Sequence, residues 1–69
     1  MKAKKFFVWE DNGSGFFEPD PNFFPIAATS AKAALEATGG KKTTWGSPRV
    51  VTGSRRENPN DPGTKILAR

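Results

Sequence analysis

Few side chains in this sequence could carry out catalytic chemistry. It contains no Cys and no His, which excludes disulfides, the usual zinc sites and nucleophile–base pairs built on thiolate or imidazole. The seven acidic residues are scattered, without the spacing of an EF-hand loop. Glu18 and Asp20 are close together, but Pro19 and Pro21 beside them predict a solvated surface turn. We therefore expect a protein that is not an enzyme and uses no metal, cofactor or small-molecule substrate.

The basic residues are the stronger candidates for binding. The densest basic region surrounds an aromatic residue, Trp45, and basic charge continues into the end of the chain. Phosphate neutralisation beside a ring on which bases can stack is what single-stranded nucleic acid requires. The alternative is a solvated basic face with Trp45 in the core, and no RRM, KH, zinc-finger or basic-zipper motif decides between the two. The candidate basic residues are Lys41, Lys42, Arg49, Arg55, Arg56, Lys65 and Arg69.

Three adjacent Phe pairs lie within residues 6–24. Because successive side chains of a strand point to opposite faces, such a pair places one ring on each face. Phe6 then shares a face with Val8, and Phe7 shares the other face with Trp9. That second face is either covered by the C-terminal residues or packed at the sheet margin, or it stays open as an aromatic docking surface. The candidate partner-binding aromatic residues are Phe7, Trp9 and Trp45.

The net charge of +4 is unevenly distributed along the chain. Residues 1–36 carry four Lys and five acids, a sum of −1, whereas residues 37–69 carry seven Lys or Arg and two acids, a sum of +5. The basic half is also poorer in apolar residues. This asymmetry predicts a folded front half and a basic rear half that meets an acidic partner.

A small α+β scaffold is expected to position these residues. Aromatic and β-branched runs predict a small antiparallel sheet, and Asn12-Gly13 is a strong hairpin signal. Thr29 or Ser30 can cap a short helix that ends at Gly39-Gly40. That helix is too short to be stable alone, so it must pack on the sheet. The expected strands are residues 4–10, 15–18 and 48–52, and the expected helix is 30–38.

The end of the chain has a different composition. From Gly53 onward it is rich in Pro, Gly, Asn and charge, which predicts a disordered basic tail. We therefore expect one small α+β domain in residues 1–53 and a flexible C-terminal tail in residues 54–69. Deleting the tail should leave the fold intact and reduce binding.

Nothing in the sequence predicts a membrane association. The longest apolar runs have four residues or fewer, which cannot span a bilayer. The basic N-terminus is not followed by the apolar region of a signal peptide. We expect a cytoplasmic protein, located in the host cytoplasm if the protein is viral.

The stretch KKFFVWEDNGSG and the end GSRRENPNDPGTKILAR give the chain a recognisable layout. It resembles that of very small lytic-bacteriophage regulators, which have a minimal sheet, one helix, no Cys and a flexible basic tail. The resemblance implies docking on the host RNA polymerase, with inhibition of initiation or antitermination as the outcome. It concerns architecture alone, so no residue role is carried over from it.

Three hypotheses follow. The first is a small regulator that binds a large protein complex such as RNA polymerase, for which Trp9→Ala or Trp45→Ala should weaken binding more than any single Lys→Ala. The second is a direct binder of single-stranded nucleic acid or DNA through residues 41–56, with strongly salt-dependent affinity. The third is a small structural protein of a virion, for which oligomers are expected.

Overall fold

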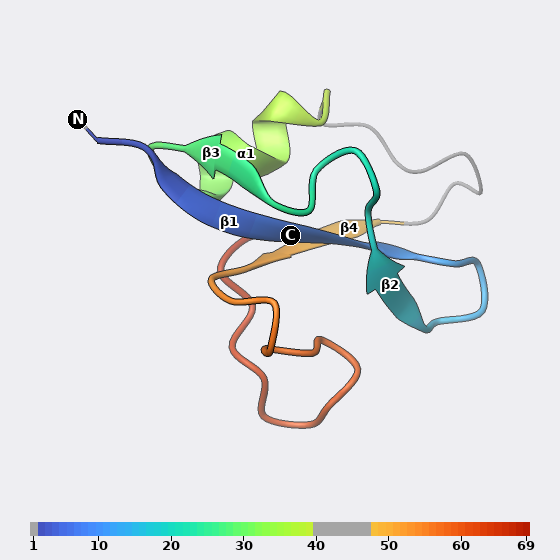
Figure 1. The fold of residues 1–69 in the computed structure, drawn as a ribbon. Coiled ribbons are helices and arrows are strands. Elements are labelled where there is room, and N and C mark those ends of the chain that lie inside the picture. Colours follow the sequence, from blue (N-terminus) through green and yellow to red (C-terminus); the bar gives the residue numbers. More distant parts are fainter. Residues whose placement is uncertain (1, 40–47) are drawn as a thin grey trace.

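The aromatic run KKFFVWED forms the strand around which the sheet is built. The computed structural model describes residues 2–39 and 48–69, and in these ranges it contains four antiparallel strands and one short helix (Figure 1). The predicted α+β class is therefore confirmed. The elements are β1 (Lys4–Asp11), β2 (Phe17–Pro19), β3 (Ile26–Ala28), α1 (Ala31–Ala37) and β4 (Arg49–Thr52).

β1 lies at the centre of the sheet and pairs with each of the other strands. β4 runs along the second half of β1, in a register that joins Val8 to Val51. The other edge of β1 is lined first by β3, with Phe6 opposite Ile26, and then by β2. Between β2 and β3 the chain stays attached, because Val8 accepts a hydrogen bond from the Asp20 N–H (2.9 Å) and donates one to the Phe23 carbonyl (3.2 Å).

β3 was not predicted as a strand. The sequence indicated only that the chain is extended before Pro25. Three residues carry too weak a β pattern to be recognised, and β3 forms because β1 offers it an edge to pair with.

Local signals define the helix. The Ser30 hydroxyl accepts a hydrogen bond from the Ala33 N–H (3.0 Å), which makes Ser30 the N-cap. After the helix, Gly39 adopts a φ of 91°, where a residue without a Cβ is favoured. Ala34 is fully buried against β1 and β4, so its small side chain lets the helix approach the sheet closely. Among the described residues, no helix has the length and apolar character needed to span a membrane.

The two faces of β1 are divided as the strand alternation predicts. Phe6 and Val8 form the main core with Ala34 and Val51, beneath α1. On the opposite face, the ring of Phe24 packs edge-on against the rings of Phe7 and Trp9, each with its centroid 4.9 Å away. The sheet therefore has a second aromatic cluster on the face away from α1.

The prediction of a disordered tail is corrected by the structure. Residues 54–69, here called the C-terminal segment, loop over the side of the sheet away from α1 and return to β4 (Figure 1). Val51 donates a hydrogen bond to the Ala68 carbonyl and accepts one from the Leu67 N–H, both 2.8 Å long. Composition indicated disorder, but an unpaired edge of β4 and a place for Ala68 beside the core favour an ordered path.

Candidate functional site

The aromatic face predicted as a docking surface is largely closed. Trp9 is only 6% exposed, and its indole N–H donates a hydrogen bond of 2.8 Å to the buried Thr52 hydroxyl. Phe7 is half-buried against Phe24. The prediction of Trp9 as an exposed partner-binding residue is therefore wrong, and Phe7 is mainly a packing residue. The reason is that Phe24 covers this face of β1, a contact that strand alternation alone does not reveal.

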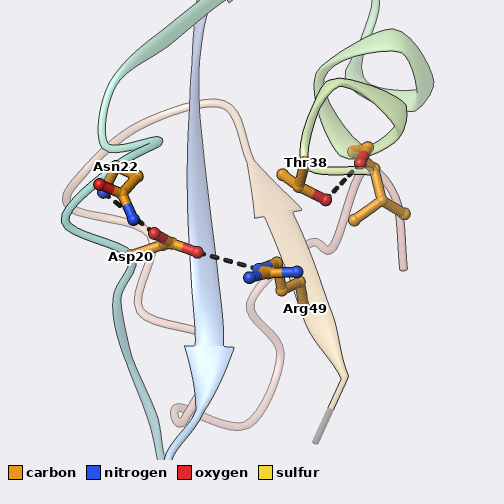
Figure 2. Close-up of polar contacts among 5 residues, drawn as sticks. Asp20, Asn22, Thr38 and Arg49 are labelled. Carbon is orange, nitrogen blue, oxygen red and sulfur yellow. Dashed lines mark hydrogen bonds and ion pairs between the residues drawn. The ribbon is translucent and has the colours of Figure 1, made fainter. Parts of the chain in front are cut away.

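The structure describes only part of the predicted basic cluster, and it places Arg49 in an ion pair. Lys41, Lys42 and Trp45 lie outside the residues that the structure describes. Arg49 belongs to a structural ion pair, since its Nε donates to Asp20 Oδ2 over 2.9 Å and its side chain is 14% exposed (Figure 2). Its guanidinium also lies 5.9 Å from the centre of the Phe23 ring. Arg49 is thus a packing and pairing residue rather than a solvated phosphate contact.

Asp20 was expected on a solvated turn, and this expectation is wrong. Asp20 is 1% exposed. One carboxylate oxygen accepts from Arg49, and the other accepts from the Asn22 N–H over 3.0 Å (Figure 2). A buried charge needs such partners, so the Asp20–Arg49 pair fixes the chain between β2 and β3 to β4.

Glu10 lies beside this ion pair. In the sheet it is opposite Glu18 on β2 and opposite Arg49 on β4. Burial is the main cause that raises the pKa of Glu10 above its ordinary value of 4.5, and the neighbouring charges of Asp20 and Glu18 raise it further, while Arg49 opposes them. Within the described residues, no group of three or more acidic side chains is arranged to hold a metal ion.

The remaining basic candidates are exposed and lie on the C-terminal segment. They are Arg55, Arg56, Lys65 and Arg69. Trp45, the ring predicted to lie among the basic residues, is outside the described residues. The predicted basic cluster around Trp45 is therefore described only in part.

A different aromatic residue is presented to solvent. Phe16, at 53% exposure, is the most exposed large apolar residue in the described ranges. It follows the loop between β1 and β2, and we call residues 11–18 the hairpin tip. The Asn12-Gly13 turn is recognisable in the sequence, but the sequence does not distinguish Phe16 from Phe17. The register does so, because β2 begins at Phe17 and leaves Phe16 outside the paired strand.

The loop that presents Phe16 is held by its own hydrogen bonds. Asp11 Oδ1 accepts from the N–H groups of Gly13 (2.8 Å) and Gly15 (3.0 Å). Asn12 Oδ1 accepts from the N–H and the hydroxyl of Ser14, and the Asn12 N–H donates to the Phe16 carbonyl (2.9 Å). Gly13 and Gly15 have φ values of 94° and 89°, which glycine adopts without steric cost. The loop is thus a pre-formed turn rather than a loose connection.

The C-terminal segment fixes the neighbouring residue. The side-chain amide of Asn60 accepts from the Phe17 N–H over 2.7 Å and donates to the Phe17 carbonyl over 2.8 Å. Asn60 is itself positioned by Asn58, whose side-chain oxygen accepts from the Asn60 backbone N–H and side-chain NH₂. Asn60 therefore pairs with the backbone of β2 as a neighbouring strand would. No sequence motif indicates this contact, which joins residues 43 positions apart.

Comparisons with protein-family models, with curated proteins and with solved structures found no match to this chain.

Proposed function

We propose that this protein is a small non-enzymatic regulator that acts by docking on a larger protein complex through its hairpin tip. The observation that carries the proposal is the exposure of Phe16 on a loop already fixed by hydrogen bonds. An aromatic anchor gives a large apolar contact area, and a pre-formed loop loses little conformational entropy on binding.

Two features favour a protein partner over nucleic acid. Trp9, one of the two Trp residues that could have stacked on bases, is buried in the sheet. Arg49, at the centre of the predicted basic cluster, is engaged by Asp20. A nucleic-acid groove of the predicted kind would combine solvated basic side chains with an accessible ring, and neither Trp9 nor Arg49 supplies such a group.

The proposed partner is a large cytoplasmic machine, with the host RNA polymerase as the leading candidate. This choice rests on the resemblance to small bacteriophage regulators in the minimal sheet and single helix, and not in a flexible tail, since the C-terminal segment is ordered. The consequence of docking would be modulation of transcription, by inhibition of initiation or by antitermination.

The test is direct binding to purified bacterial RNA polymerase holoenzyme, measured by biolayer interferometry in the absence of nucleic acid. Phe16→Ala should weaken binding by about 2 kcal/mol or more, which is over tenfold in Kd, because it removes the anchor. The matched control is Ala27→Ser, at an exposed position of β3 far from the hairpin tip. This control should bind as the unmodified chain does.

The outcomes test separately the docking role of the hairpin tip and the identity of the partner. Binding that is unaffected by Phe16→Ala would remove the hairpin tip from the function. No binding to the holoenzyme would reject this partner, and capture from nuclease-treated bacterial lysate, compared between the unmodified chain and Phe16→Ala, would then show whether the tip binds another complex. Capture that occurs only when nucleic acid is retained, equally for both chains, would instead favour the basic residues.

A further inference from the structure

The loop of the hairpin tip contains an Asn side chain that the next backbone nitrogen can attack. Asn12 is followed by Gly13, and both residues are exposed. A bond between Asn12 Cγ and the Gly13 nitrogen closes a cyclic imide within the chain, so this reaction needs no second molecule to be positioned. Gly13 has no side chain to shield its nitrogen, and its φ of 94° is one that glycine adopts without steric cost.

The Gly13 nitrogen is hydrogen-bonded to a group that can take its proton. Its N–H donates to Asp11 Oδ1 over 2.8 Å. The same carboxylate oxygen accepts from the Gly15 N–H over 3.0 Å, which holds it in place. A peptide nitrogen becomes a nucleophile only as its proton is removed, and a carboxylate within hydrogen-bond reach can act as the general base. Asp11 is therefore placed to activate Gly13.

The side-chain amide of Asn12 is polarised by a second pair of hydrogen bonds. Asn12 Oδ1 accepts from the backbone N–H of Ser14 over 3.0 Å and from the Ser14 hydroxyl. Attack on Cγ moves negative charge onto Oδ1. Donors that already point at this oxygen stabilise that charge as it develops. The loop thus supplies a base for the attacking nitrogen and donors for the oxygen that becomes charged.

The other Asn residues, all within the described ranges, lack this arrangement. Asn58 precedes a Pro, which has no N–H to activate. The side-chain amide of Asn60 is occupied by both backbone groups of Phe17. Asn22 precedes Phe23, whose N–H donates to a backbone carbonyl rather than to a carboxylate. Asn12 is therefore the residue at which the reaction is expected.

We propose that Asn12-Gly13 is a self-modification site, at which the folded loop converts Asn12 to aspartate and isoaspartate. Asp11 takes the proton of the Gly13 N–H as this nitrogen forms its bond with Asn12 Cγ. The Cγ–Nδ2 bond then breaks, and Nδ2 takes the proton from Asp11 and leaves as ammonia, which restores the carboxylate. Water opens the cyclic imide at either carbonyl, giving aspartate or isoaspartate at position 12.

Conversion alters the loop that carries Phe16. The Asn12 N–H donates to the Phe16 carbonyl over 2.9 Å, and isoaspartate adds a methylene to the main chain between that N–H and Gly13. Both products also place a new negative charge next to Asp11. The loop is then less pre-organised, so partner binding should weaken. This effect on docking rests on the proposed function, whereas the conversion itself does not.

The test follows the full chain during storage at neutral pH, using peptide mapping by mass spectrometry to separate the Asn, aspartate and isoaspartate forms of each site. Conversion at Asn12 should be several-fold faster in the folded chain than in the same chain unfolded in guanidinium chloride. Asp11→Asn keeps an oxygen that can accept the loop hydrogen bonds but removes the base, so it should slow conversion several-fold. The matched control Glu18→Gln removes an exposed carboxylate of β2 and should leave the rate unchanged.

Other results overturn the proposal or its consequence for docking. A folded chain that converts no faster than the unfolded chain would show that the loop contributes nothing beyond the Asn-Gly sequence. Equal rates in Asp11→Asn and Glu18→Gln, with the loop amide signals retained in NMR, would remove Asp11 as the base.

The isoaspartate form, separated by chromatography, is then compared with the fresh chain in binding to RNA polymerase holoenzyme. Several-fold weaker binding is expected. Equal binding would reject the effect on docking. Because mapping measures conversion without any partner, failure of the proposed function leaves the evidence for the modification site intact.

Discussion

The charged form of Glu10 destabilises the folded protein. Its carboxyl group is half-buried and lies near two further carboxylates, Glu18 and Asp20. Arg49 is shared with Asp20, so it offsets only part of this repulsion. Burial and the two acids raise the pKa of Glu10, which means that the folded state binds a proton more readily than the unfolded chain does.

The sign of the effect on stability follows from this shift. The contribution of Glu10 is most favourable below its ordinary pKa of 4.5 and is lost as the pH rises through the raised value. Glu10→Gln should therefore increase the free energy of unfolding at neutral pH. The gain should disappear when the pH is lowered below 4.5. Urea unfolding followed by Trp fluorescence at the two pH values measures it.

The control for this experiment is Glu36→Gln, at an exposed position on α1. It removes one negative charge without changing the region around Asp20. An equal gain in both variants would attribute the effect to net charge rather than to the surroundings of Glu10.

The short elements of this protein are stabilised mainly by side chains from other parts of the chain. β2 has three residues, and its outer side is bound at Phe17 by the amide of Asn60. Exposed strand edges invite pairing with other chains, and a side-chain amide that bonds both backbone groups blocks such pairing. The same contact also fixes the residue next to Phe16.

Asn60→Ala should loosen the hairpin tip. It removes two hydrogen bonds to a partly buried backbone, which we expect to cost roughly 1–2 kcal/mol of stability. It should also weaken partner binding, because the loop that carries Phe16 is then less pre-organised. Denaturant unfolding and hydrogen exchange of the Phe17 amide are the measurements.

Asn22→Ala is the matched control, since Asn22 is exposed and bonds to Asp20 through its backbone N–H. Its side chain can be removed without breaking that contact. If Asn60→Ala and Asn22→Ala behave alike, the amide of Asn60 has no positioning role.

Those parts of the fold that depend on local signals could be predicted from the sequence. The β1 pattern, the Ser30 cap and the glycines after α1 lie within a few residues of what they determine. The contacts that define the site join distant residues, with 29 positions between Asp20 and Arg49 and 43 between Phe17 and Asn60. Composition indicates nothing about such pairs, which is why the sequence left open whether Trp9 is covered and gave no sign that Arg49 is bound to Asp20.

At the level of the whole molecule, the C-terminal segment is part of the folded structure. It pairs with Val51, places Ala68 beside the core and bonds the Thr52 hydroxyl through the carbonyl of Ser54. A chain of 69 residues has a small core, so losing these contacts removes a large share of its stability.

A chain limited to residues 1–53 should therefore fail to fold. This reverses the expectation for a disordered tail. Far-UV circular dichroism and the dispersion of amide signals in NMR compare it with the full chain. The control is a full-length chain with Arg55→Ser and Arg56→Ser, which loses basic charge from exposed positions and should remain folded. A well-dispersed spectrum from residues 1–53 would show that the segment is dispensable for folding.

The central position of β1 determines how the sheet of this protein unfolds. Within the described ranges, each strand pairing in the sheet includes β1. No part of the sheet can separate from β1 and keep another strand as its partner, so β1 belongs to a single cooperative unfolding unit. The hairpin tip is the far end of this strand. A ligand that binds the hairpin tip only when β1 is paired therefore slows hydrogen exchange at the most protected amides of the sheet. This includes amides that lie far from the bound ligand.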